Sequence, residues 1–237
     1  VVARYGVGVS NVDLAAAEAR GIVVTNTPGA NSASVAELTV GLILNLMRPI
    51  FFAAQETHAG GWPRTRGLSL ADKIVGIYGL GAIGREVAQR LSTFACQLLA
   101  CDVAPDFEFV ERVGIQLVDP DTLISQADVL SLHVPVVDET LNMVDADFLA
   151  AMKSGSFLVN TARGELIDEA ALRNALDSEH LAGAAMDVFH VEPPGADHIL
   201  ASHPKVIATP HMGSHTDGAT NAMGDMALQD CLAVLRG

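Results

Sequence analysis

The sequence predicts an α/β fold organised as a doubly wound parallel sheet. Short runs of β-branched and aliphatic residues alternate with Ala- and Leu-rich helical patterns over most of the 237 residues. Several of these runs are continuously apolar, as in strands whose two faces are both covered by helices. A glycine loop joins one such run directly to a helical pattern. Regular alternation of strands and helices is typical of a parallel sheet covered on both faces.

The expected elements follow from periodicity and from helix-capping residues. We expect strands at 22–26, 74–78, 97–102, 115–118, 129–133, 156–160, 183–188 and 206–209. Helices are expected at 31–47, 82–94, 120–126, 146–152, 169–178 and from about 216 to 235. Asn31 and Ser32 can cap the first of these helices, and Asp168 can cap the one at 169–178. The clearest loop is 57–70, which contains Gly60, Gly61, Pro63 and Gly67.

Composition excludes several classes of function. The chain carries 28 Asp and Glu against 14 Lys and Arg, a net charge of −14, so a nucleic-acid partner is not expected. Half of the residues are hydrophobic, which excludes intrinsic disorder. Three cysteines without a C-x-x-C pair predict neither disulfides nor a metal site, and they favour a cytoplasmic location. We see no signal peptide, and the apolar stretch 35–47 is too short to span a membrane.

The glycine loop Gly79-Leu-Gly81-Ala82-Ile83-Gly84 indicates a dinucleotide site. It follows the strand at 74–78 and opens the helix at 82–94, which is the context that such a motif requires. Gly79 permits a tight turn, Gly81 lets the backbone approach a pyrophosphate, and Gly84 lets the helix pack closely on the strand. The amino end of the helix then offers free N–H groups to the phosphates. A tight structural turn without a ligand is the alternative.

Asp102 favours NAD over NADP as the cofactor. It ends the strand that follows the glycine loop, close to the spacing of about 20 residues expected for a ribose-binding carboxylate. A carboxylate there accepts hydrogen bonds from the 2′-hydroxyl and repels a 2′-phosphate. Residues 103–108 contain no Lys or Arg that could neutralise such a phosphate. The alternative is an ordinary turn aspartate.

Several expected strands end on polar groups, which the parallel sheet would bring to one edge. These strand-end groups are His133, Thr161 with Arg163, Asp187 with Glu192, and Thr209 with His211. They suit hydride transfer coupled to proton transfer, with His211 as the acid/base and Glu192 as its partner. Arg163 can bind a carboxylate or polarise a carbonyl.

Each of these residues also has a simpler interpretation. His211 can be a structural strand-end histidine, Arg163 can tie a loop to a helix end, and Glu192 can be a solvated loop residue. His133 is more often structural or cofactor-adjacent than catalytic.

Nine motifs occur in an order that resembles a known family. They are Tyr5-Gly-Val-Gly-Val-Ser-Asn-Val-Asp13, Asn26-Thr-Pro-Gly-Ala-Asn31, Ser34-Val-Ala-Glu37, Gly79-Leu-Gly-Ala-Ile-Gly84, Ser131-Leu-His-Val-Pro135, Asn160-Thr-Ala-Arg-Gly164, Ala185-Met-Asp-Val-Phe189, Glu192-Pro193 and Thr209-Pro-His-Met-Gly213. Together they resemble the D-isomer-specific 2-hydroxyacid dehydrogenases, in particular the branch of the D-3-phosphoglycerate dehydrogenases. The resemblance covers essentially the whole chain.

The resemblance implies roles for specific residues. The catalytic residues would be Arg163, Glu192 and His211, and Gly6, Val7 and Gly8 would bind the substrate carboxylate. The residues that would bind NAD are Gly79, Gly81, Ala82, Ile83, Gly84, Asp102, His133, Val134, Pro135, Thr161, Ala162, Asp187 and Gly213. Residues 10–213 would form a Rossmann NAD-binding domain, and 1–9 and 214–237 would be remnants of a flavodoxin-like substrate domain that lacks its N-terminal part.

We therefore expect an NAD-dependent oxidoreductase acting on a small D-2-hydroxyacid or its 2-keto acid. Glu192 counts against the related formate dehydrogenases, which carry glutamine there, and Tyr5 against the phosphite-oxidising relatives, which carry lysine. The alternatives are an NAD(H)-sensing corepressor-like binding module, and a different NAD enzyme such as an adenosylhomocysteinase. The sequence does not choose among phosphoglycerate, hydroxypyruvate, glyoxylate and larger keto acids.

A homodimer is also expected. The helix at 31–47 is apolar on most of its faces, which means either that both sides are buried within one chain or that one side meets a partner. Relatives use this region to dimerise.

Overall fold

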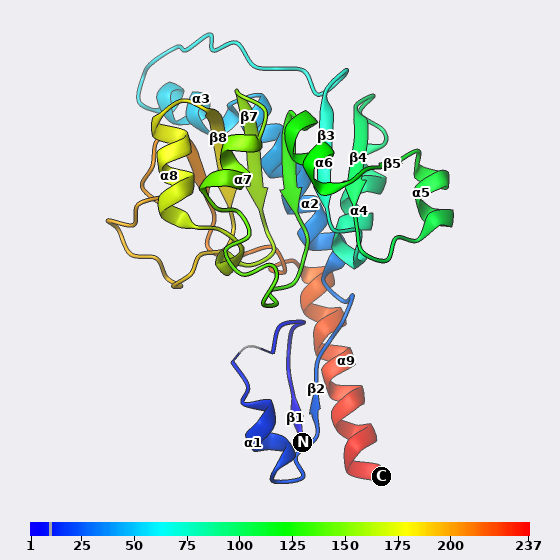
Figure 1. Cartoon of the computed structure of the whole chain (residues 1–237). Helices are drawn as coiled ribbons and strands as arrows, with labels where there is room; N and C mark the ends of the chain where they lie inside the picture. The colour runs from blue at the N-terminus through cyan, green and yellow to red at the C-terminus, as the bar shows by residue number, and fades with distance from the viewer. Residues whose placement is uncertain (10) are drawn as a thin grey trace. The chain divides into compact units, whose positions relative to one another are not determined.

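The computed structural model describes residues 1–9 and 11–237 (Figure 1). Contacts divide these residues into two compact units. The smaller unit comprises Val1–Val35 and Gly213–Gly237, and the larger unit comprises Ala36–Met212. The expected division into 10–213 and its two flanking segments stays a prediction.

The larger unit is built on a seven-stranded sheet in which every pairing is parallel. Its strands, in spatial order, are β5 (Gln116–Leu117), β4 (Gln97–Cys101), β3 (Ile74–Tyr78), β6 (Val129–Leu132), β7 (Ser156–Asn160), β8 (Leu181–Met186) and β9 (Val206–Ala208). The chain runs outward from β3 to β5 and then returns to place β6 against the other side of β3. This order confirms the doubly wound class and puts the topological switch point between β3 and β6.

Helices cover both faces of this sheet (Figure 1). One face packs on α4 (Ala82–Leu91), α5 (Phe107–Val113) and residues of α2 (Ser32–Met47), and the other packs on α6 (Pro120–Gln126), α7 (Ala146–Ala151) and α8 (Glu169–Asp177). Alternate residues of each strand supply the two cores, because successive side chains of a strand point to opposite faces. Val129 belongs to the first core, for example, and the next residue, Leu130, to the second.

The smaller unit contains a two-stranded parallel sheet and two helices. Strand β1 (Val2–Ala3) pairs with β2 (Val24–Thr25), so the strand expected at 22–26 is shorter and does not join the large sheet. Helices α1 (Leu14–Glu18) and α9 (Asp217–Arg236) are both capped at their amino ends by side-chain oxygens. The Tyr5 hydroxyl donates a hydrogen bond to the Thr220 carbonyl in α9, over 2.8 Å.

Among the described residues, three α-helices were not expected, namely α1, α3 (Ile50–His58) and α5, and neither was the short 3-10 helix at Gly164–Leu166. The amide of Phe51 in α3 donates to the Asn45 side chain of α2, so one helix supplies the amino-terminal cap of the next. Helix α5 begins after Asp106, whose carboxylate accepts from Phe109 N, and ends at left-handed Gly114. The expected loop at 57–70 begins only after α3 ends.

Helix α2 owes its apolar composition to burial within the chain. Each of its apolar residues from Val35 to Met47 is buried or partly buried, apart from Gly41. Of the two explanations for this composition, burial on both sides within one chain is therefore sufficient, and the homodimer stays a prediction. No single described helix is long and apolar enough to cross a membrane. Helices α2 and α3 taken together are long and apolar enough, but the chain bends by 67° between them.

The central strands should carry much of the stability of the larger unit. Leu158 in β7 is fully buried, so we expect Leu158→Ala to lower the free energy of unfolding by about 2–5 kcal/mol. Leu141→Ala, at a position that is 52% exposed, is the control and should change it by no more than about 0.5 kcal/mol. Chemical denaturation followed by circular dichroism measures both, and equal effects would contradict this assignment of the core.

Candidate functional site

The glycine loop after β3 makes a tight turn. Gly79 has φ of +98°, and a Cβ there would lie 2.7 Å from the carbonyl oxygen of His133. A Cβ on Gly84 would lie 2.0 Å from the carbonyl oxygen of Gly79. Gly81, the N-cap of α4, differs: its φ is −64°, and an added Cβ would meet no atom of the described chain within 4 Å. Packing thus requires glycine at 79 and 84, whereas the open side of Gly81 fits a group that approaches the backbone.

Asp102 is tied to this loop directly. One oxygen of its carboxylate accepts from Leu80 N over 2.6 Å, and the other accepts from Ala104 N over 2.8 Å. The carboxylate is therefore held beside the glycine loop, at the carboxyl end of β4. Each oxygen has a further lone pair, so both can still accept from a ligand hydroxyl.

His133 follows β6, on the other side of the switch point. Its Nε2 lies 2.9 Å from the Ser131 hydroxyl, and burial lowers its pKa to about 4. The ring is therefore neutral at pH 7. Val134 adjoins the glycine loop, because a Cβ on Gly79 would lie 2.9 Å from its Cγ1. Pro135 completes the turn, and its carbonyl accepts from Thr140 Oγ1.

Asn160 shapes the turn that carries Thr161, Ala162 and Arg163. Its Oδ1 accepts from Ala162 N over 3.0 Å, and its Nδ2 donates to the Arg163 carbonyl over 2.7 Å. Nη1 of Arg163 donates to the Ala162 carbonyl. The Thr161 hydroxyl lies 2.8 Å from that of buried Thr39 in α2. The turn is therefore fixed on both sides of the arginine.

Asp187 organises the end of β9, although it comes from the end of β8. It is only 1% exposed, and its Oδ1 accepts from Thr209 Oγ1 over 2.6 Å and from Met212 N over 2.9 Å. These two donors flank His211, whose φ of +50° is unusual for a residue other than glycine. The carboxylate thus holds a sparsely populated backbone conformation in place.

His211 and Glu192 form a hydrogen-bonded pair. Nδ1 of His211 lies 2.6 Å from Glu192 Oε2, while Glu192 Oε1 accepts from Phe189 N over 3.1 Å. Nδ1–H therefore donates to the carboxylate, which leaves Nε2 to exchange a proton. A cavity of about 320 Å³ adjoins the pair and has mainly apolar walls. Its other lining residues are Phe189, Pro193, Pro194, Ala208, Thr209 and Pro210.

The four remaining predicted residues lie in the smaller unit. The loop of Gly6, Val7 and Gly8 is held by the segment after β2: Gly6 N donates to Thr27 Oγ1, and Asn26 Nδ2 donates to the Val7 carbonyl. Gly213 begins the second segment of that unit. The predicted residues of the larger unit lie at the carboxyl ends of β3, β4, β6, β7, β8 and β9, in the loops that follow, or, for Ala82, Ile83 and Gly84, in the first turn of α4.

Sequence reasoning missed the residues that support this site. Asn160, Thr39, Ser131 and Phe189 all contact a predicted site residue. Ser131, Asn160 and Phe189 stand at the ends of family motifs without an assigned role, and Thr39 stands in no motif. Asn160 had the clearest signal, because a polar residue that ends an apolar strand is typical of a turn-forming side chain. Residues 1–9 and 11–237 contain no group of three or more His, Cys, Asp or Glu that could hold a metal ion.

These features are those of a nucleotide-binding dehydrogenase domain, and comparison with known proteins shows the family. Residues 40–213 match the model of the D-isomer specific 2-hydroxyacid dehydrogenase, NAD binding domain. The chain therefore belongs to the D-isomer specific 2-hydroxyacid dehydrogenase family, which confirms the resemblance seen in the sequence.

Individual relatives agree with this assignment. D-3-phosphoglycerate dehydrogenase of Methanocaldococcus jannaschii is 42% identical over 100% of this chain and 46% of its own length. Glyoxylate reductase of Thermofilum pendens is 39% identical over 100% of this chain and 72% of its own. The solved structure of NAD-dependent formate dehydrogenase from Staphylococcus aureus in complex with NAD has a TM-score of 0.89 at 36% identity, over 98% of this chain and 70% of that one. The chain spans about half the length of the D-3-phosphoglycerate dehydrogenases it matches.

The low pKa of His133 predicts a pH-dependent contribution to stability. The unfolded chain takes up a proton on this histidine near its ordinary pKa of 6.5, whereas the folded chain does so only near 4. His133 therefore contributes stability above 6.5 that is lost as the pH falls to about 4. We expect the free energy of unfolding of His133→Asn to fall less across this window than that of the wild type, in denaturant titrations at several pH values. His58→Asn, at an exposed position, should follow the wild-type curve. Parallel curves for all three would contradict the prediction.

Proposed function

We propose that this protein is an NAD-dependent dehydrogenase that interconverts a small D-2-hydroxyacid and its 2-keto acid. The observation that carries the proposal is the His211–Glu192 hydrogen bond of 2.6 Å, at the same edge of the sheet as the glycine loop. Membership of the family supports it. NAD, when bound, supplies or accepts the hydride.

His211 is the proposed acid/base. Nδ1 is engaged by the Glu192 carboxylate, so proton exchange with the substrate oxygen takes place at Nε2. During oxidation Nε2 accepts the hydroxyl proton, and during reduction it returns a proton to the keto oxygen. Glu192 fixes the orientation and the tautomer of the ring through this hydrogen bond. Asp187 keeps His211 in place through Thr209 and Met212.

Arg163 is proposed to bind the substrate carboxylate. Its backbone is held by Asn160, and one guanidinium nitrogen is already bonded to Ala162 O, which orients the remaining N–H donors. A guanidinium fork matches a carboxylate with two parallel hydrogen bonds and adds a positive charge beside the carbonyl. For Gly6, Val7 and Gly8 in the smaller unit, binding of the substrate carboxylate is proposed from the resemblance of their loop to that of the family.

The residues around the switch point fit NAD. The amino end of α4 with Gly81, Ala82 and Ile83 would hold the pyrophosphate, and Asp102 would accept from the ribose hydroxyls. The other proposed contacts are Gly79, Gly84, His133, Val134, Pro135, Thr161, Ala162, Asp187 and Gly213. A neutral His133 adds no charge at this position.

The substrate class follows the family, and the particular acid stays open. One relative is a D-3-phosphoglycerate dehydrogenase and another a glyoxylate reductase, so acids of different size and charge are candidates. The homodimer and the cytoplasmic location stay predictions.

His211→Gln tests the proposed acid/base. We expect its turnover with 2-keto acids to fall by about 100-fold or more, because it removes the proton-exchanging group, while NADH affinity stays within about twofold. NADH oxidation against a keto-acid panel measures the first quantity and NADH fluorescence titration the second. His58→Gln is the matched control, and wild-type turnover in His211→Gln would refute the assignment. A wild type that binds NADH and reduces no keto acid would instead favour the NAD-sensing module.

Gly81 and Gly84 should respond differently to alanine. Gly81→Ala is expected to fold with an unchanged melting temperature, because its φ is ordinary and the added methyl group meets no atom of the described chain within 4 Å. It should nevertheless weaken NADH binding by about tenfold, because a methyl group keeps phosphate away from the backbone. Gly84→Ala should destabilise the fold, because its Cβ would collide with Gly79 O. Unchanged NADH affinity in Gly81→Ala would count against the phosphate site.

A further inference from the structure

The loop that carries Glu192 is held at both of its ends by a single carboxylate. Glu169, the first residue of α8, accepts from His190 N through Oε1 over 3.3 Å and lies 3.0 Å from His198 Nε2 through Oε2. His190 and His198 bracket Glu192 in the sequence. The carboxylate and the His198 ring are both largely buried, with side chains 15% and 13% exposed.

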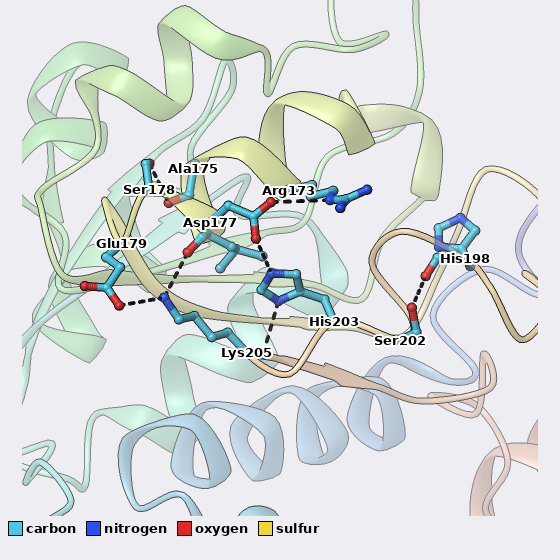
Figure 2. A network of polar contacts seen from close by, with 10 residues as sticks. Arg173, Ala175, Asp177, Ser178, Glu179, His198, Ser202, His203 and Lys205 are labelled. Atoms are coloured by element: carbon cyan, nitrogen blue, oxygen red, sulfur yellow. Dashed lines mark hydrogen bonds and ion pairs between the residues drawn. The ribbon is translucent and has the colours of Figure 1, made fainter.

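Backbone contacts determine which nitrogen of His198 carries the proton. Nδ1 accepts from Leu200 N and Ala201 N, over 3.2 and 3.3 Å, so it has no proton. Nε2 therefore carries the proton, and it is this nitrogen that lies 3.0 Å from Glu169 Oε2. Ser202 bonds the His198 carbonyl through its hydroxyl (Figure 2), and Leu200 is fully buried, so this end of the loop is anchored in the core.

The anchored ends are linked to Glu192 through Phe189. The Phe189 ring packs edge-on against the His198 ring, with centroids 5.3 Å apart, and its backbone N–H donates to Glu192 Oε1. A Cβ on Gly164 would lie 2.2 Å from the Phe189 carbonyl carbon, so the turn that carries Arg163 rests on the same segment. The ring of His190 bonds the Ile167 carbonyl over 2.8 Å. Movement of this loop would displace Glu192 and the support beneath Arg163 together.

We infer that Glu169 and His198 act as positioning residues for the His211–Glu192 pair. They do not touch the reacting atoms. Their role is to hold the 189–198 loop in the position in which Glu192 Oε2 can accept a hydrogen bond from His211 Nδ1. This inference rests on the proposed function for its consequence in turnover, but the position of Glu192 can be measured without turnover.

The opposite end of α8 offers a matched control. Asp177 Oδ1 lies 3.2 Å from His203 Nε2, and His203 Nδ1 accepts from Lys205 N (Figure 2). This is also a carboxylate–imidazole contact on the same helix, with the same tautomer of the ring, although Asp177 is more exposed than Glu169, at 55% against 15%. It holds the start of β9, and none of its hydrogen bonds involves the 189–198 loop. Asp177→Asn therefore changes an equivalent contact without touching the support of Glu192.

The test compares Glu169→Ala, Glu169→Gln and Asp177→Asn. The first readout is the ¹⁵N spectrum of the His211 ring, with Glu192→Gln as the reference for a ring that has lost its carboxylate. We expect the spectrum of Glu169→Ala to move toward that reference, Glu169→Gln to move less because its amide oxygen can replace only one of the two contacts, and Asp177→Asn to match the wild type. A His211 spectrum of wild-type form in folded Glu169→Ala would overturn the inference. If Glu169→Ala does not fold, the His211 spectrum of Glu169→Gln is used instead, and a spectrum of wild-type form in that variant would overturn the inference.

The second readout is turnover with the keto acid that the wild type reduces best. Glu169→Ala should lower kcat by about tenfold or more and alter the pH–rate profile, with NADH affinity within about twofold, because a displaced base costs rate without removing the cofactor site. Unchanged kcat and pH profile would also overturn the inference. A wild type without turnover would contradict the proposed function alone, since the spectrum of His211 still reports on the loop.

Discussion

The parallel pairing of β3 with β6 is the constraint on which the rest of the larger unit depends. The strands that follow β3 and those that follow β6 are added toward opposite edges of the sheet, so the carboxyl ends of β3 and β6 lie side by side and no connection crosses between them. The glycine loop and His133 meet there, so closely that a Cβ on Gly79 would strike the His133 carbonyl. Parallel pairing also requires helical connections, which bury both faces and produce the two separate cores. Both the position of the site and the division of the core therefore follow from the parallel pairing of β3 with β6.

Buried polar groups then orient the loops at this edge. Asp187 has little contact with water, and its carboxylate is stable there because Thr209 and Met212 donate to it. Asn160 has the same function one strand away, with its amide bonded on both sides to its own turn. Each of these groups would be costly to bury without its partners, so the loop conformations that supply the partners are favoured. Asp187 thereby fixes the backbone around His211, and Asn160 fixes the backbone around Arg163.

The sequence was sufficient for those features that depend on local pattern. The seven strands of the large sheet, the helix start at Ala82 and the capping role of Asp168 all follow from runs, glycines and caps within a few residues. Helix α5 could have been found too, since Asp106 and Gly114 are ordinary start and stop signals. Helix α3 could not, because its first turn is capped by Asn45 from another helix and none of its residues is fully buried. Asn45 stands inside the apolar run of α2 and not directly before α3, so its position does not mark it as a cap.

The candidate site shows the same limit at the level of individual contacts. Family motifs name Glu192 and His211, because those residues stand in recognisable sequence contexts. Glu169 stands at an ordinary helix start, where a glutamate is expected for its interaction with the helix dipole alone. Only the folded chain shows that one of its oxygens accepts from the backbone at one end of the loop, while the other lies 3.0 Å from the His198 ring at the opposite end. Residues of this kind are fixed by geometry that spans many positions of the chain, so no local pattern reports them, and the structure is the first place where the support of a proton-transfer pair can be recognised.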